Sequence, residues 1–173
     1  MSEIEFVVDQ LKCAFDGGAW HGPALMEILD GVDAKTAAAR PISGAHSIWE
    51  LVLHVTAWEQ AIRTRTVERR ALQLSDEQNF PRATDVSEGA WRQALETLRQ
   101  GHEKLIATVS GLIESQLGEQ VPGKPYDIRF MLMGAAQHAA YHGGQIALLK
   151  KKSNESPGKT HRLSADCLLL RYS

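Results

Sequence analysis

The sequence predicts an all-α protein, a single four-helix bundle. Apolar residues recur at helical spacing in four long stretches, and no stretch shows the alternation that is typical of a β-strand. The length of 173 residues favours one domain with a core of its own. The joining segments are long enough for a topology other than simple up-and-down. We assign residues 1–152 to the bundle and residues 153–173 to a C-terminal tail, either flexible or docked on a partner chain.

Capping and breaking residues mark the first helix and the short segment after it. Ser2 and Glu5 have the spacing of a capping box, in which each side chain accepts a hydrogen bond from the other residue's backbone N–H. The apolar residues that follow at helical spacing are Ile4, Val7, Val8, Leu11 and Phe15. An Asp-Gly-Gly sequence at 16–18 ends this helix. A second piece begins with Pro23 in its first turn and runs to Leu29.

The second long helix has the clearest start in the chain. Ser47 and Glu50 form a capping box, and the helix is predicted to continue to about Arg70. Its apolar stripe consists of Leu51, Val55, Trp58 and Ile62. Residues 73–84 are polar and contain Pro81, so we expect a loop there.

The third and fourth long helices complete the bundle. The third begins at Ser87 alone or at Asp85 paired with Glu88, and its stripe carries Trp91, Leu95, Leu98, Leu105 and Val109. The fourth runs from Tyr126 or Asp127 to Lys152. Its inner stripe contains Ile128, Met131, Ala135, His138, His142, Ile146 and Leu149.

Composition excludes several classes of protein. The 19 basic and 21 acidic residues give a net charge of −2, whereas a nucleic-acid-binding protein is usually basic. Two cysteines cannot build a disulfide scaffold or a four-thiolate zinc site. No stretch has the length and apolarity of a membrane span, and the start lacks the pattern of a secretory signal. We therefore expect a cytoplasmic protein with neither nucleic-acid nor membrane partners.

Seven histidines make an imidazole site the first candidate, and two of them are paired. His138 and His142 are four residues apart, so their side chains leave the same face of one helix, with Cβ atoms about 5–6 Å apart. Both lie on the apolar inner stripe rather than among charged residues. Two imidazoles so placed can bind one metal ion, although such a pair also arises by chance.

His54 strengthens the hypothesis because it also lies on an apolar stripe, on the second long helix. A single inward histidine is most simply a core residue hydrogen-bonded to a backbone carbonyl. Three inward histidines on two helices of a bundle are better explained by one ion bound by His54, His138 and His142. All-imidazole ligation suits zinc, nickel, copper or iron, and we name zinc and nickel as the leading candidates. Three ligands leave a position for water or substrate, as in catalytic sites.

The other four histidines are predicted to be structural or solvated. We expect His21 to be a structural or wall residue, His46 a loop residue, His102 a solvated residue and His161 part of the tail.

Two further polar residues have two interpretations each. Glu50 is a helix cap or a general base. Gln145 follows His142 by three residues and either packs or hydrogen-bonds to a ligand.

Three motifs resemble the DinB-like family of metal-binding four-helix bundles. They are HSIWELVLHVTAWE at 46–59, preceded by Arg40-Pro41, QHAAYHGGQI at 137–146, and AWHGP at 19–23, which recurs in one branch of the family. The resemblance covers roughly residues 3–152. It implies a long crossover between the second and third helices, metal ligands at the three histidines named above, and a homodimer. The family's name refers to induction by DNA damage and does not imply DNA binding.

The resemblance also suggests an activity. Family members include thiol-dependent S-transferases and a thiol-dependent isomerase, in which the metal lowers the pKa of a thiol. We therefore expect a metal-dependent enzyme that activates a low-molecular-weight thiol cosubstrate. A hydrolase that activates water and a non-catalytic stress-response bundle with a structural ion are the alternatives. Because cysteine is scarce, any thiol in the chemistry is expected to arrive with a cosubstrate.

Overall fold

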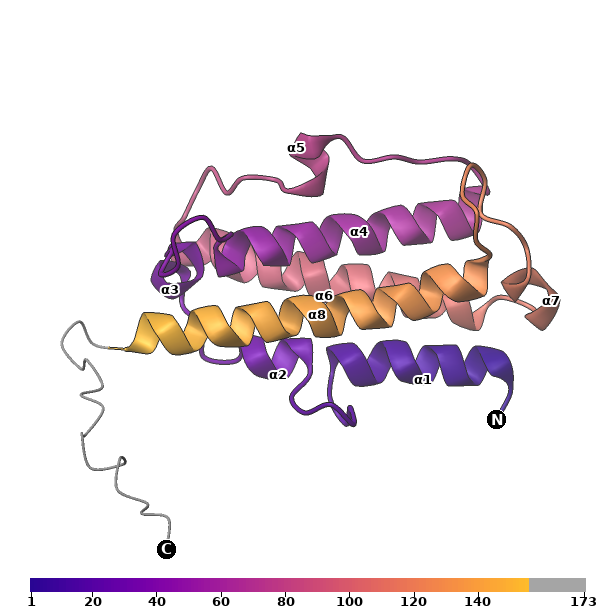
Figure 1. Cartoon of the computed structure of the whole chain (residues 1–173), viewed down its shortest axis with the longest axis horizontal. Coiled ribbons are helices and arrows are strands. Elements are labelled where there is room, and N and C mark those ends of the chain that lie inside the picture. The colour runs from indigo at the N-terminus through magenta and orange to yellow at the C-terminus, as the bar shows by residue number, and fades with distance from the viewer. Residues whose placement is uncertain (156–173) are drawn as a thin grey trace, which may run out of the picture.

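The computed structural model describes residues 1–155 and shows an all-helical bundle, as predicted (Figure 1). Within that range, four long helices form its body: α1 (Glu3–Phe15), α4 (Ile48–Glu68), α6 (Glu88–Ser110) and α8 (Ile128–Asn154). Four short helices lie in the connections: α2 (Leu25–Leu29), α3 (Ala34–Ala38), α5 (Asp76–Asn79) and α7 (Glu114–Leu117). The predicted tail falls almost wholly on residues 156–173, outside the described part.

Side-chain caps set the start of every long helix. The capping boxes of Ser2 and Ser47 are both present. Ser87 caps α6 by accepting from the N–H of Ala90, which decides between the two predicted starts, and Asp127 caps α8. Each cap satisfies N–H groups that have no partner within the helix.

Two predicted helix ends shift by two residues. α4 ends at Glu68 rather than near Arg70, because Arg69 adopts the left-handed backbone conformation with φ of 49°. α8 continues through Asn154, two residues beyond Lys152.

The connection between α4 and α6 is a long crossover. Residues 69–87 return along the length of the bundle, so α4 and α6 run in the same direction (Figure 1). α4 packs between α6 and α8, and α1 packs against α8 and α6 on the opposite side. This arrangement confirms the topology that the family resemblance implied and places the middle of α4 beside the middle of α8.

The connections contain short helices, α3, α5 and α7, that the sequence pattern did not predict. The polar segment after Leu29 contains α3, and the predicted loop 73–84 contains the single turn α5. A signal for α5 was present, since Ser75 and Gln78 form a capping box. A single turn lacks the apolar periodicity on which helix prediction depends.

Two clusters of buried apolar residues fill the bundle. One contains Trp49, Trp91 and Ile146, and the other contains Leu105, Leu132 and Ala139. The ring centroids of Trp49 and Trp91 are 5.0 Å apart, and the Trp91 indole N–H donates to the Val32 carbonyl at 2.7 Å.

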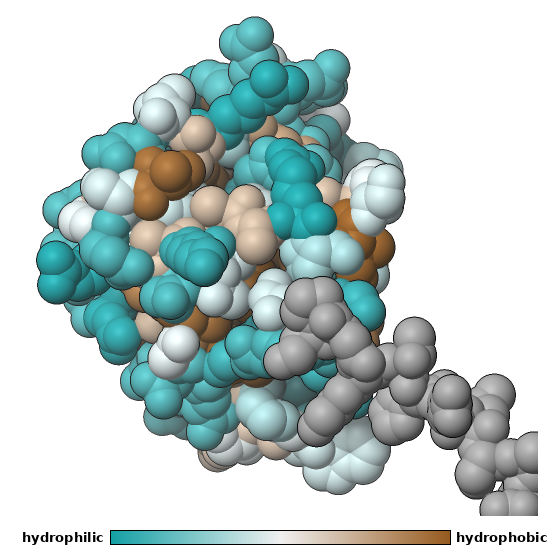
Figure 2. Space-filling view, turned by 90° about the vertical axis from the view of Figure 1, so that its left-hand side faces the viewer, coloured by the Kyte–Doolittle hydropathy of each residue, from teal (hydrophilic) through white to brown (hydrophobic). Residues whose placement is uncertain are grey.

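The end of the molecule at which α8 terminates is mainly hydrophilic, with apolar side chains scattered among polar ones (Figure 2). No helix in residues 1–155 combines the length and the apolar character that crossing a membrane requires.

Candidate metal centre

The bundle brings together the three histidines that the sequence singled out. His54 lies about two turns into α4, and His138 and His142 lie one turn apart on α8, the helix packed against it. The Nε2 atom of His138 is 3.0 Å from Nε2 of His54 and 3.1 Å from Nε2 of His142. In the described residues these three form a group of side chains able to hold one metal ion.

The geometry of the three nitrogens fits a transition-metal ion. Zinc binds imidazole nitrogen at about 2.0–2.1 Å, so nitrogens at tetrahedral angles would stand roughly 3.3 Å apart. The two observed separations are within a few tenths of an ångström of that value. Three nitrogens that converge in this way can each direct a lone pair at one ion placed between them.

Hydrogen bonds on the outer sides of two rings orient their Nε2 atoms inward. Nδ1 of His54 is 2.5 Å from the carbonyl oxygen of Asn79, and Nδ1 of His142 is 2.8 Å from Oε1 of Gln145. Both oxygens can only accept, so Nδ1 carries the hydrogen in each ring. The Nε2 lone pairs are thereby left for a metal, which is the usual arrangement around histidine ligands.

Burial keeps the three imidazoles unprotonated. Burial lowers the pKa of His138 from 6.5 to about 3, and His142 and His54 add to the effect. It also lowers the pKa of His54 and of His142, although the hydrogen bonds that these rings donate to Asn79 and Gln145 partly oppose the shift. Neutral imidazoles bind a cation at neutral pH without first losing a proton.

The crossover supplies a wall of the site that sequence reasoning missed. Asn79, at the end of α5, accepts from His54 through its backbone and from the Trp58 indole N–H through its side chain at 2.7 Å. The Phe80 ring stacks on the His54 ring with centroids 4.0 Å apart. A backbone carbonyl carries no signal in the sequence, so only the path of the crossover reveals this contact.

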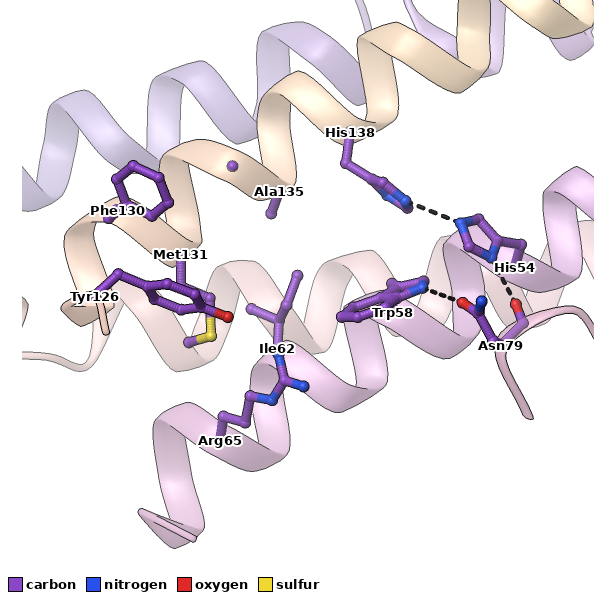
Figure 3. Close-up of a pocket in the computed structure, with 11 residues that line it drawn as sticks. His54, Trp58, Ile62, Arg65, Asn79, Tyr126, Phe130, Met131, Ala135 and His138 are labelled. Atoms are coloured by element: carbon purple, nitrogen blue, oxygen red, sulfur yellow. Dashed lines mark hydrogen bonds between the residues drawn. The ribbon is translucent and has the colours of Figure 1, made fainter. Parts of the chain in front are cut away.

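A cavity of about 390 Å³ borders the histidines on one side (Figure 3). One wall is the face of α4 that carries His54, Trp58, Ile62 and Arg65. The other wall comes from α8 and the residues just before it: Tyr126, Phe130, Met131, Gly134, Ala135 and His138. His54 and His138 therefore belong both to the three-histidine group and to the lining of an open cavity.

The comparison with protein families agrees with the geometry. A model of the DinB superfamily matches residues 19–146, well over half of the chain, and this segment includes all three histidines. The chain belongs to the DinB superfamily. No match was found among curated proteins or among solved structures. Membership and the three-histidine group together fit a metal-binding DinB-like protein.

In this DinB-superfamily protein Glu50 is a helix cap and not a residue of the metal group. One carboxylate oxygen accepts from the Ser47 backbone N–H at 3.0 Å, and the other pairs with Arg40. His46 lies 3.5 Å from the same carboxylate. Burial would raise the pKa of Glu50, but these three partners together hold it below its usual value. The cap is therefore the role of Glu50 that its contacts show, and the carboxylate lies outside the three-histidine group.

His21 and His46 lie outside the three-histidine group. His21 is exposed and lines a separate groove with Cys13 between α1 and α8. His46 is exposed and stacks on Phe80, with ring centroids 3.9 Å apart. His161 lies outside the described residues.

The prediction that His102 is solvated was wrong. The side chain is buried, and Nδ1 lies 2.8 Å from Oε1 of Glu59 on α4. The Phe15 ring stacks on it at 3.8 Å. The signal was present, because His102 stands four residues after Leu98 and three before Leu105 on the stripe of α6. The charged residues on either side of it in sequence face other directions on the helix.

Replacing Gln145 with leucine should weaken metal binding by roughly 10- to 100-fold. The substitution removes the acceptor that holds the Nδ1–H of His142 and so frees the ring to rotate. Competitive titration with Zn²⁺ and with Ni²⁺ against a chromophoric chelator measures the affinity. Gln137→Leu, at an exposed glutamine on the same helix, is the matched control. Equal dissociation constants for the two variants would contradict a positioning role for Gln145.

Proposed function

We propose that this protein is a metal-dependent enzyme that activates a low-molecular-weight thiol and transfers its sulfur to an electrophilic carbon. The observation that carries the proposal is the position of the histidines at the edge of an accessible cavity. Three protein ligands beside open space are typical of a catalytic site, whereas a structural zinc site is closed by a fourth ligand. Superfamily membership supports the metal binding on which the proposal depends.

The residues of the chain have distinct roles in this proposal. A divalent transition metal ion held by three neutral imidazoles would supply the positive charge that lowers the pKa of an incoming thiol. Asn79 and Gln145 hold two of the imidazole rings in place. Trp58 and Ala135 line the cavity with apolar surface, which limits competing attack by water. The thiol gives its proton to solvent water, its sulfur bonds to the electrophilic carbon, and the leaving group departs with the electrons of the broken bond.

The position of Cys13 supports an external thiol. Cys13 lies on α1 in a groove between α1 and α8, and it does not line the cavity beside the histidines. Burial, together with the neighbouring Asp9, raises the pKa of its thiol, so less of it is thiolate at neutral pH. Cys167 lies outside the described residues.

A thiol-transfer screen on metal-reconstituted protein tests the proposal. Chlorodinitrobenzene serves as the electrophile, with cysteine, glutathione and dithiothreitol as alternative thiols. We expect turnover with bound Zn²⁺ or Ni²⁺, and a loss of roughly 100-fold or more in His138→Ala. Gln137→Ala, next to it on an exposed position, should retain activity.

Two results would contradict the thiol-transfer proposal. Metal-dependent hydrolysis of a nitrophenyl ester, with no thiol transfer, would identify water as the nucleophile. Turnover that is equal in the His138→Ala and Gln137→Ala variants would show that the metal group is not used.

A further inference from the structure

The end of the cavity away from the histidines holds a buried cation. Arg65 is 2% exposed, and its guanidinium donates to the Leu72 carbonyl through Nε at 3.1 Å and through Nη2 at 2.5 Å. No carboxylate in residues 1–155 forms an ion pair with Arg65, and its Nη1 has no hydrogen-bond partner there. Because burying a charge without a counter-charge is costly, this end of the cavity favours an anion.

The spacing along α4 puts Arg65 and the metal group at opposite ends of one cavity. Arg65 follows His54 by about three helical turns, which returns its Cα to the same face of α4 roughly 16 Å further along the axis. Trp58 and Ile62 occupy that face between them. Figure 3 shows His54 and His138 at one end of the cavity and Arg65 near the other.

The walls between the two ends are apolar and aromatic. Trp58, Ile62, Met131 and Ala135 line the middle of the cavity. The Arg65 guanidinium lies 5.4 Å from the Trp58 ring centroid, a cation–π contact that helps to hold it in place. The Tyr126 hydroxyl points into the same end of the cavity and makes no hydrogen bond within the described residues (Figure 3).

We propose that the cavity binds a small molecule with an apolar or aromatic body and a carboxylate at one end, and that Arg65 recognises the carboxylate. The inference rests on the proposed function, because it makes this molecule the acceptor whose reactive carbon faces His54 and His138. A planar guanidinium fork matches a carboxylate better than it matches other small anions of one charge. Apolar walls disfavour polyanions, which keep a large hydration shell.

Calorimetric binding to the metal-free protein, with chelator present, tests the recognition at Arg65. The probes are phenylpropanoate and phenylpropanamide. They share the phenylethyl group, and they differ in that the first ends in a charged carboxylate and the second in a neutral amide. We expect the acid to bind roughly 10- to 100-fold more tightly than the amide. Arg65→Met should abolish that preference, and Arg63→Met, a neighbouring arginine that does not line the cavity, should keep it. Without metal, the acid cannot gain affinity by coordinating an ion.

Arg65→Met could fail to fold, because Arg65 also ties α4 to Leu72, and a second variant keeps the test conclusive in that case. Tyr126→Phe removes one hydroxyl and should reduce the preference for the acid by roughly 2- to 10-fold. Equal binding of acid and amide to the wild-type protein overturns the proposal, and so does a preference that survives in folded Arg65→Met. Neither measurement involves thiol or turnover, so failure here is distinguishable from failure of the thiol-transfer screen.

Discussion

Replacing His102 with alanine is expected to lower the free energy of unfolding by about 3–5 kcal/mol. The substitution leaves the Glu59 carboxyl buried among α4, α6 and α1 without its hydrogen-bond partner. In the described residues Oε2 of Glu59 and Nε2 of His102 already lack partners, so no other group compensates. The loss of stacking on Phe15 adds to the destabilisation.

The destabilisation should grow as the pH rises. Burial raises the pKa of Glu59 above its ordinary value of 4.5, although the hydrogen bond from His102 opposes the shift. Removal of His102 takes away that opposition. A carboxyl with a raised pKa in the folded state contributes stability below the unfolded value of 4.5, and it loses this contribution as the pH rises through the folded value. The His102→Ala variant should therefore be closer to wild type at about pH 5 than at about pH 8.

Urea unfolding followed by circular dichroism measures both effects. His21→Ala, at an exposed histidine, is the control and should change stability by less than about 0.5 kcal/mol. The double variant Glu59→Leu with His102→Leu should recover most of the loss, because apolar residues can replace a buried polar pair. If His102→Ala and His21→Ala unfold at the same urea concentration, the Glu59–His102 pair makes no contribution to the free energy of unfolding.

Saturating Zn²⁺ or Ni²⁺ should raise the free energy of unfolding by about 4 kcal/mol when the free ion is near 1,000 times its dissociation constant. The ion would be held where the three Nε2 atoms converge, and that arrangement exists only in the folded chain. His54→Ala should remove most of this gain. The metal-free protein should stay folded, because the two apolar clusters fill the bundle without the three histidines.

Thermal unfolding with and without metal, paired with metal analysis of the purified protein, checks this expectation. Gln137→Ala should bind close to one ion per chain, as the wild type should. Metal content that is unchanged in His54→Ala would rule out the three-histidine site. Complete unfolding on chelation would instead identify the ion as structural and would favour the non-catalytic alternative.

The three histidines can be identified from the amino-acid sequence because their signals are local. The spacing of His138 and His142 fixes their direction on one helix, and His54 lies on an apolar stripe of another. The caps at Ser2 and Ser47 can also be predicted from the sequence, since a capping box involves residues that are three apart. Helical periodicity indicates the fold class for the same reason.

Other parts of the site depend on contacts between residues far apart in sequence. The carbonyl of Asn79 reaches His54 only because the crossover returns along α4. The hydrogen bond between Glu59 and His102 joins two helices. The sequence did not predict it, because the charged neighbours of His102 in the sequence indicated a solvated side chain. Arg65 resembles several surface arginines in sequence, and packing alone buries it at the end of a cavity.

The all-α fold class, the starts of the helices and the three candidate ligand histidines thus follow from patterns within single helices. These patterns are present in the sequence however the helices pack. The partner of buried His102, the carbonyl that orients His54 and the shape of the cavity depend on how α4, α6 and α8 pack together with the crossover. These features are decided by distances between segments, and a pattern within one segment contains no information about such distances.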